Sequence, residues 1–300
     1  MSPAMAEADF PLEERSSPWR DAWRRFDRNR AAVVSACIVA AIILASLAGP
    51  WLVRLYNGFE YDTLGLDNRL ANPSLLHPFG TDTLGRDLLS RALYGCRISL
   101  MVGFVSTLIS LVIGVSYGSV AGYFGGRLDE IMMRTVDIFY ALPDILLVVI
   151  LMALFDRSLG LLFLALGATS WLTTARIVRG QVLSLKHEQF VDAARCAGVS
   201  DTGIILRHLL PNTIGPIIVY ATLTIPSIIL GEAFLSFLGL GVPPPASSLG
   251  VLASEGAEAI SVHPVLLIAP GVLMAIMLMS MNFLGDGVRD ALDPRGGRNL

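Results

Sequence analysis

Long uncharged tracts are the feature that most constrains what this chain can fold into. A helix needs about 20 mostly apolar residues to cross the hydrocarbon core of a bilayer. The uncharged tracts that reach or approach this length are residues 31–53, 98–126, 158–175, 209–231 and 264–285. A weaker candidate, residues 131–155, carries three charged side chains. The sequence therefore predicts an all-α integral membrane protein with six transmembrane helices.

The composition supports this prediction and narrows the possible partners. Hydrophobic residues make up 54% of the chain and charged residues 16%, whereas soluble domains average roughly 45–50% and roughly 25%. The net charge of −3 is uninformative, and no basic cluster suggests nucleic acid as a partner. The cysteines lie far apart in the sequence, so we expect Cys37, Cys96 and Cys196 to be unpaired.

The positions of the arginines predict the orientation in the membrane. Six spans place both termini on one side, and basic residues concentrate in cytoplasmic segments. If the N-terminus is inside, most of the 22 lysine and arginine residues fall in such segments, so we expect cytoplasmic termini. The expected divisions are a cytoplasmic N-terminal segment (1–30), an uncleaved first transmembrane helix (31–53), an extracytoplasmic loop (54–96), a core with the remaining spans (97–286) and a cytoplasmic tail (287–300).

Two segments outside the spans have helical patterns of their own. Ser17 and Pro18 suit the N-cap and first position of a helix. The aromatic residues that follow on one face predict a helix on the cytoplasmic leaflet, with a solvated tail as the alternative; they are Trp19, Trp23 and Phe26. In the extracytoplasmic loop, Thr81 and Asp82 are expected to cap a helix with an apolar face formed by Leu84, Leu88, Leu89 and Leu93.

Motifs for cofactor and metal binding are missing from the sequence. The only lysine, Lys186, does not belong to a Gly-x-x-x-x-Gly-Lys loop, so we do not expect ATP to bind in that way. The histidines form no i, i+4 pair and have no cysteine partner at ligand spacing; they are His77, His187, His208 and His263. We therefore expect no catalytic residue, cofactor site or metal site on this chain.

Acidic side chains in the predicted spans are costly unless they face a bundle interior or a wet cavity. One interpretation makes Asp137, Asp144 and Glu232 part of a polar translocation path. The other places Asp137 at the cytoplasmic boundary, paired with Arg134, and Glu232 at the outer boundary. Asp144 follows Pro143, where a helix loses a backbone hydrogen bond, and both interpretations stay open there. Asp144 and Glu232 remain candidate path residues.

The polar stretch FVDAARCAGVSDTGIILRHLLPN, residues 190–212, has a more specific pattern than a connecting loop needs. Residues 188–197 favour a helix on which Ala193, Ala194 and Ala197 form a surface without bulk. Gly198 suits the left-handed position that ends a helix.

A second short helix is expected directly after this glycine. Ser200 or Asp201 can cap it, and it should cover residues 202–210. Pro211 is expected to end it, so that Asn212 begins the fifth span. The result is an elbow of two helices on the cytoplasmic face, although an ordinary amphipathic connector fits the pattern equally well.

The elbow stretch resembles the signature loop of ABC importer permeases. That signature is an acid-Ala-Ala, followed by Gly and then by Leu-Pro. Here it reads Asp192-Ala193-Ala194, Gly198 and Leu210-Pro211, with Asp where the family usually has Glu. Further motifs resemble the C-type permease of dipeptide and oligopeptide importers; they are HPFGTDTLGRD (77–87), LSFLGLG (235–241) and NFLGDGVRDALDPR (282–295). After residue 241 the chain departs from the pattern, with Leu249-Gly250 in place of Trp-Gly.

This resemblance implies a type I ABC importer permease fold, with residues 97–286 as its core and 184–212 as its coupling loop. It also implies partners: a homologous second permease, two cytoplasmic ATPases that bind the ATP and Mg, and an extracytoplasmic solute-binding protein. The implied setting is the lipid of a bacterial cytoplasmic (inner) membrane, and the implied substrate is a dipeptide or oligopeptide. ATP binding by the partners would move the loop around Asp192–Pro211. A nickel chelate or glutathione is the alternative substrate.

Two other classes of function are open to such a chain. An ion-coupled secondary carrier would use Asp144 or Glu232, need no ATPase, and be expected to contain inverted repeats, of which no obvious one is present. A structural membrane subunit would tolerate Gly198→Val or added bulk at Ala194.

Overall fold

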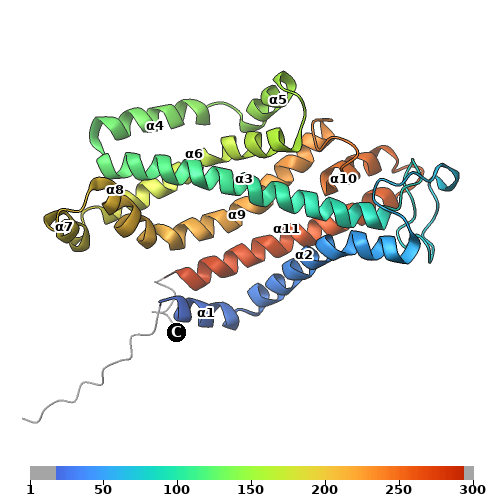
Figure 1. Ribbon diagram of the computed structural model, residues 1–300, viewed down its shortest axis with the longest axis horizontal. Coiled ribbons are helices and arrows are strands. Elements are labelled where there is room, and N and C mark those ends of the chain that lie inside the picture. Colours follow the sequence, from blue (N-terminus) through green and yellow to red (C-terminus); the bar gives the residue numbers. More distant parts are fainter. Residues whose placement is uncertain (1–17, 294–300) are drawn as a thin grey trace, which may run out of the picture.

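The computed structural model describes residues 18–293, and in this part of the chain the regular structure is helical apart from one isolated β-bridge. Figure 1 shows long helices running side by side. The helices are α1 (Pro18–Arg28), α2 (Arg30–Asn57), α3 (Leu88–Phe124), α4 (Gly126–Tyr140), α5 (Asp144–Leu154), α6 (Leu159–Leu185), α7 (Gln189–Cys196), α8 (Asp201–Ile204), α9 (Leu210–Phe237), α10 (Leu249–Glu258) and α11 (Val265–Leu292), with short turns η1 (Leu66–Asn68) and η2 (Ile205–Leu209).

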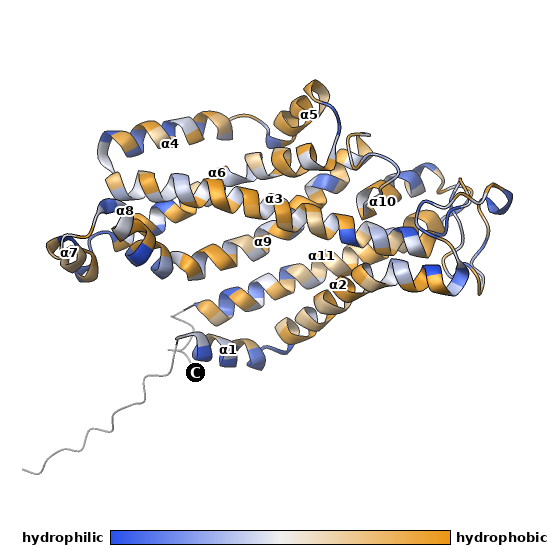
Figure 2. Ribbon diagram, viewed as in Figure 1, coloured by the Kyte–Doolittle hydropathy of each residue, from blue (hydrophilic) through white to orange (hydrophobic). Residues whose placement is uncertain are grey.

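The predicted spans correspond to these long helices. Five continuous helical segments are long and apolar enough to cross a membrane: α2, α3, α6, α9 together with α8 and η2, and α11. The sixth predicted span is broken into α4 and α5, which meet at an angle of 78°. The break follows from Pro143, which precedes the first residue of α5. Figure 2 shows apolar residues along the spans and hydrophilic residues in α1, beside α8 and in the loop after α2.

The most extensive helix packing joins α3 to α6 and depends on glycine. Gly114, Gly118 and Gly122 are spaced four residues apart on one face of α3. A Cβ at Gly118 would lie 2.4 Å from the carbonyl oxygen of Ala175 in α6, so the two backbones touch. Residues 114–118 also have the Gly-x-Ser-x-Gly spacing of a hydrolase nucleophile elbow. They lie inside a continuous helix, whereas that elbow requires a strand-to-helix turn.

The N-terminal amphipathic helix is present as α1, whose Trp19 and Trp23 are exposed. Arg25 of α1 donates a hydrogen bond of 2.7 Å to the carbonyl of Asp293, so α1 lies beside the end of α11. The expected N-cap Ser17 and the tail residues 294–300 lie outside the described residues. Figure 1 places α1, α7, α8 and the end of α11 at the same end of the molecule.

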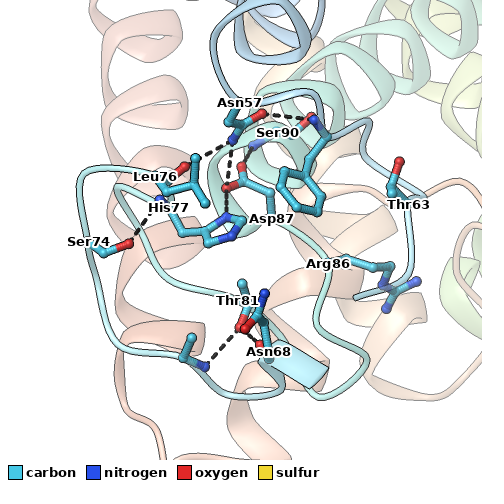
Figure 3. Close-up of polar contacts among 12 residues, drawn as sticks. Asn57, Thr63, Asn68, Ser74, Leu76, His77, Thr81, Arg86, Asp87 and Ser90 are labelled. Atoms are coloured by element: carbon cyan, nitrogen blue, oxygen red, sulfur yellow. Dashed lines mark hydrogen bonds and ion pairs between the residues drawn. The ribbon is translucent and has the colours of Figure 1, made fainter. Parts of the chain in front are cut away.

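At the opposite end, the expected helix start in the loop after α2 was wrong. The helix begins at Leu88, and its N-cap is Asp87, whose carboxylate accepts a 2.7 Å hydrogen bond from the N–H of Ser90. The other oxygen of Asp87 accepts a 2.8 Å hydrogen bond from Nδ1 of the buried His77 (Figure 3). Leu84 therefore lies before the helix. The cap is Asp87 because His77, ten residues earlier, holds its carboxylate in place.

Asp82, expected to cap this helix with Thr81, instead forms the centre of a charged cluster. One oxygen accepts two backbone N–H groups at 2.8 and 2.9 Å. The other lies 2.6 Å from Nε of Arg86 and 2.6 Å from Nη1 of the buried Arg91. Arg91 also donates to both oxygens of Glu255 in α10, at 2.7 and 3.2 Å. The cluster therefore fastens α10 and the loop after α2 to the start of α3.

Candidate coupling elbow and central cavity

The elbow predicted between the fourth and fifth spans is present, with one difference. Helix α7 ends in a Schellman motif: Gly198 has φ of +77°, and Val199 N–H donates to the carbonyl of Ala194 at 3.1 Å. The side chain of Ser200 caps α8 by accepting a hydrogen bond from the N–H of Gly203. This confirms the glycine turn and the second cap.

Pro211 does not end the second helix, and that expectation was wrong. The chain is helical from Asp201 to Phe237 without interruption. The turn η2, of the π type, directly precedes α9 and provides the extra room that a proline ring needs within a helix. The elbow therefore continues directly into a membrane-spanning helix.

The small residues of α7 face two different directions. Ala193 and Ala197 are exposed, whereas Ala194 is buried in the chain's own core beside Tyr123 and Val182. The expectation that all three alanines form one open surface was therefore wrong for Ala194, because this residue packs α7 against the adjoining spans. Asp192 is exposed and pairs with Arg195 at 3.1 Å.

Polar contacts join the elbow to the end of α3. The hydroxyl of Tyr123 donates a 2.6 Å hydrogen bond to Asp201 in α8, and the guanidinium of Arg195 lies 5.8 Å from the centre of the Tyr123 ring. Lys186 donates to the carbonyl of Gly122 at 3.1 Å. Sequence reasoning missed Tyr123 because its partner is 78 residues away.

Replacing Tyr123 with phenylalanine is expected to loosen the elbow without unfolding the spans. The substitution removes one hydrogen bond to a charged group, which contributes about 1.5–3 kcal/mol. Amide hydrogen exchange in α7 and α8 should become at least about fivefold faster. Tyr56→Phe removes the same hydroxyl from a contact to the carbonyl of Leu75 at the opposite end, and should leave exchange in α7 and α8 unchanged. Unchanged exchange in Tyr123→Phe would contradict the bracing role.

A cavity of about 870 Å³ lies between the α4–α5 break, α6 and α9. Asp144, the first residue of α5, lines it. Glu232 does not, although its neighbours Gly231 and Phe234 do. The structure thus separates the two candidate path residues.

Glu232 lies within the packing of α9 against α10. It is fully buried, and one carboxylate oxygen accepts hydrogen bonds from Ser236 at 2.7 Å and Ser248 at 2.6 Å. Ser248 also caps α10 by accepting from the N–H of Val251. These contacts tie the carboxylate to the position of α10 in this conformation.

Asp137 pairs with Arg176 of α6 at 2.7 Å, so the expected pairing with Arg134 was wrong. Arg176 is held in place because its guanidinium also lies 4.2 Å from the centre of the Tyr140 ring. Within residues 18–293, no group of three or more His, Cys, Asp or Glu side chains could hold a metal ion.

Comparisons with known proteins agree with this architecture. Residues 114–297 match the family described as binding-protein-dependent transport system inner membrane component, and residues 17–73 match the N-terminal TM domain of oligopeptide transport permease C. An oligopeptide transport system permease protein of Haemophilus influenzae is 47% identical, covering 96% of this chain and 91% of the relative. A dipeptide transport system permease protein of Bacillus subtilis is 44% identical, covering 96% of this chain and 89% of the relative.

One solved structure shares the fold at low sequence identity. It is a chain of the MetNI methionine ABC transporter in an inward facing conformation, with a TM-score of 0.56 and 22% identity. The similarity covers 69% of this chain and 96% of that chain. It confirms the predicted all-α permease fold.

Proposed function

The chain belongs to the family of binding-protein-dependent transport system inner membrane components, and on this premise we propose that it is the permease subunit of an ATP-driven importer of dipeptides or oligopeptides. The observation that carries the proposal is similarity over nearly the whole chain to oligopeptide and dipeptide permeases. The chain itself catalyses no reaction. Two partner ATPases bind ATP and Mg and hydrolyse the ATP.

The elbow is the part through which those ATPases act. Its residues of interest are Asp192, Ala193, Ala194, Gly198, Leu210 and Pro211. Helix α7 offers Asp192 and Ala193 on an exposed face, whereas Ala194 and Gly198 set the position of that face. Leu210 and Pro211 belong to the continuous helix that carries a displacement onward.

The continuous helix formed by α8, η2 and α9 links the elbow to the cavity. It begins at Asp201 beside α7 and lines the cavity between Tyr220 and Leu235. Because the helix is continuous, movement of α7 and α8 shifts the cavity wall. The ATP-bound ATPases fit one position of the elbow better than the other. ATP can shift the permease between its two conformations only through this difference in affinity.

The remaining partners complete the importer in a bacterial inner membrane. The cavity face, with its exposed Asp144, meets water or the homologous second permease rather than lipid, because a charge in hydrocarbon is costly. A solute-binding protein delivers the peptide at the outer end, which carries the loop after α2. The end with α1, α7 and α8 is cytoplasmic.

Reconstitution tests this function against the ion-coupled carrier. The chain, its second permease, the ATPases and the binding protein are placed in proteoliposomes, and peptide uptake is measured with and without ATP. Peptide-stimulated ATP hydrolysis with ATP-dependent uptake is expected. Peptide uptake by permeases lacking the ATPases, driven by an ion gradient, would refute the proposal.

A further inference from the structure

The cavity between α5, α6 and α9 has an unusual charge distribution. Among the described residues that line it, Asp144 is the only one with a charged side chain. One oxygen of its carboxylate accepts a hydrogen bond of 2.8 Å from the N–H of Ile145, so the chain's own acid occupies one of the free N–H groups at the start of α5. A basic group that touches the lining, Arg176 over Tyr140, is paired with Asp137. The cavity therefore has a net negative wall.

Most of the seven hydroxyl groups that line the cavity present acceptors rather than donors. Four of them donate their hydrogens to carbonyls of their own helices, leaving only oxygen lone pairs for a ligand. These side chains are Thr169, Ser170, Thr224 and Ser227. Aromatic rings add faces that attract cations; they belong to Phe139, Tyr220 and Phe234.

A carboxylate, acceptor oxygens and aromatic faces together suit a group that donates hydrogen bonds and carries positive charge. We propose that this cavity binds an ammonium side chain of the passing peptide, with Asp144 as its counter-charge. The inference rests on the proposed function and adds a selectivity that belongs to the permease. Peptides with an extra ammonium group, such as a lysine side chain, should pass more readily than those with an extra carboxylate.

The test uses the complete importer in proteoliposomes with one preparation of the binding protein, saturated with peptide. Uptake of Ala-Lys-Ala and Ala-Glu-Ala is measured for the unaltered chain and for Asp144→Asn, Asp144→Glu and Asp156→Asn. Asp156 is an exposed acid that follows α5 and does not line the cavity, so it is the matched control. Because the binding protein is identical throughout, a change in the uptake ratio reports on the permease.

Asp144→Asn is expected to lower the ratio of lysine-peptide to glutamate-peptide uptake about fivefold, since two charges 4 Å apart in water interact by about 1 kcal/mol. Asp144→Glu and Asp156→Asn should keep the ratio of the unaltered chain. An unchanged ratio in Asp144→Asn, or an equal loss for both peptides, would overturn the inference and leave the importer function standing. Failure of the unaltered complex to transport either peptide would instead refute the function on which the inference rests.

Discussion

Substituting valine for Gly198 is expected to lower peptide uptake about tenfold while the assembled complex continues to hydrolyse ATP. Gly198 has φ of +77°, and no atom lies within 4 Å of the position a Cβ would take, so the cost comes from backbone strain rather than a clash. A left-handed conformation costs a non-glycine residue roughly 1–2 kcal/mol, which corresponds to about a tenfold shift between conformations. The elbow should then lose the geometry that transmits the movement of the ATPases.

The chain provides a matched control for this substitution. Gly58 ends α2 with φ of +78° and equally open surroundings, at the opposite end of the molecule. Gly58→Val should carry the same backbone strain and leave uptake per ATP hydrolysed unchanged. Normal uptake in Gly198→Val, or an equal loss in both variants, would show that the elbow does not couple the ATPases to transport.

Replacing Asp82 with alanine is expected to destabilise the protein by roughly 3–5 kcal/mol. The change removes four hydrogen bonds. It also leaves Arg91, which is 2% exposed, with only one of its two carboxylate partners. Thermal unfolding of the solubilised protein should occur roughly 10 °C lower.

Asp67→Ala is the control for Asp82→Ala. Asp67 is an exposed acid of the same loop, in η1, and its removal should change stability by no more than about 0.5 kcal/mol. If the two variants unfolded at the same temperature, the charged cluster could not be what fastens the loop after α2 to α3 and α10.

The spans could be predicted from the sequence because length and hydropathy are properties of each tract by itself. The turn at Gly198 and the cap at Ser200 were also predictable, since both depend on neighbours within a few residues. The start of α3 was not, because Asp87 is held by His77. Helix α10 was missed as well: its ten residues are too few to span, and its buried face is defined by contacts with α3, α9 and α11.

For the candidate site too, local patterns could be predicted and long-range contacts could not. The elbow motif could be predicted from the sequence, but the burial of Ala194 depends on packing against other helices. The role of Tyr123 could be found only in the structure, because its hydroxyl and the acceptor Asp201 belong to distant segments. The different surroundings of Asp144 and Glu232 depend on which side of each helix faces the cavity, and the sequence does not specify this.

The central claim, that α7 is the surface a partner ATPase contacts, can be tested at a cysteine already present. Cys196 is exposed in α7, Cys96 is buried, and the exposed Cys37 on α2 can be replaced by alanine. The rate of Cys196 labelling by a hydrophilic maleimide is measured for the permease pair alone and for the complete importer. The account predicts labelling at least about tenfold slower in the complete importer, whereas equal rates in an importer that transports peptide would contradict it.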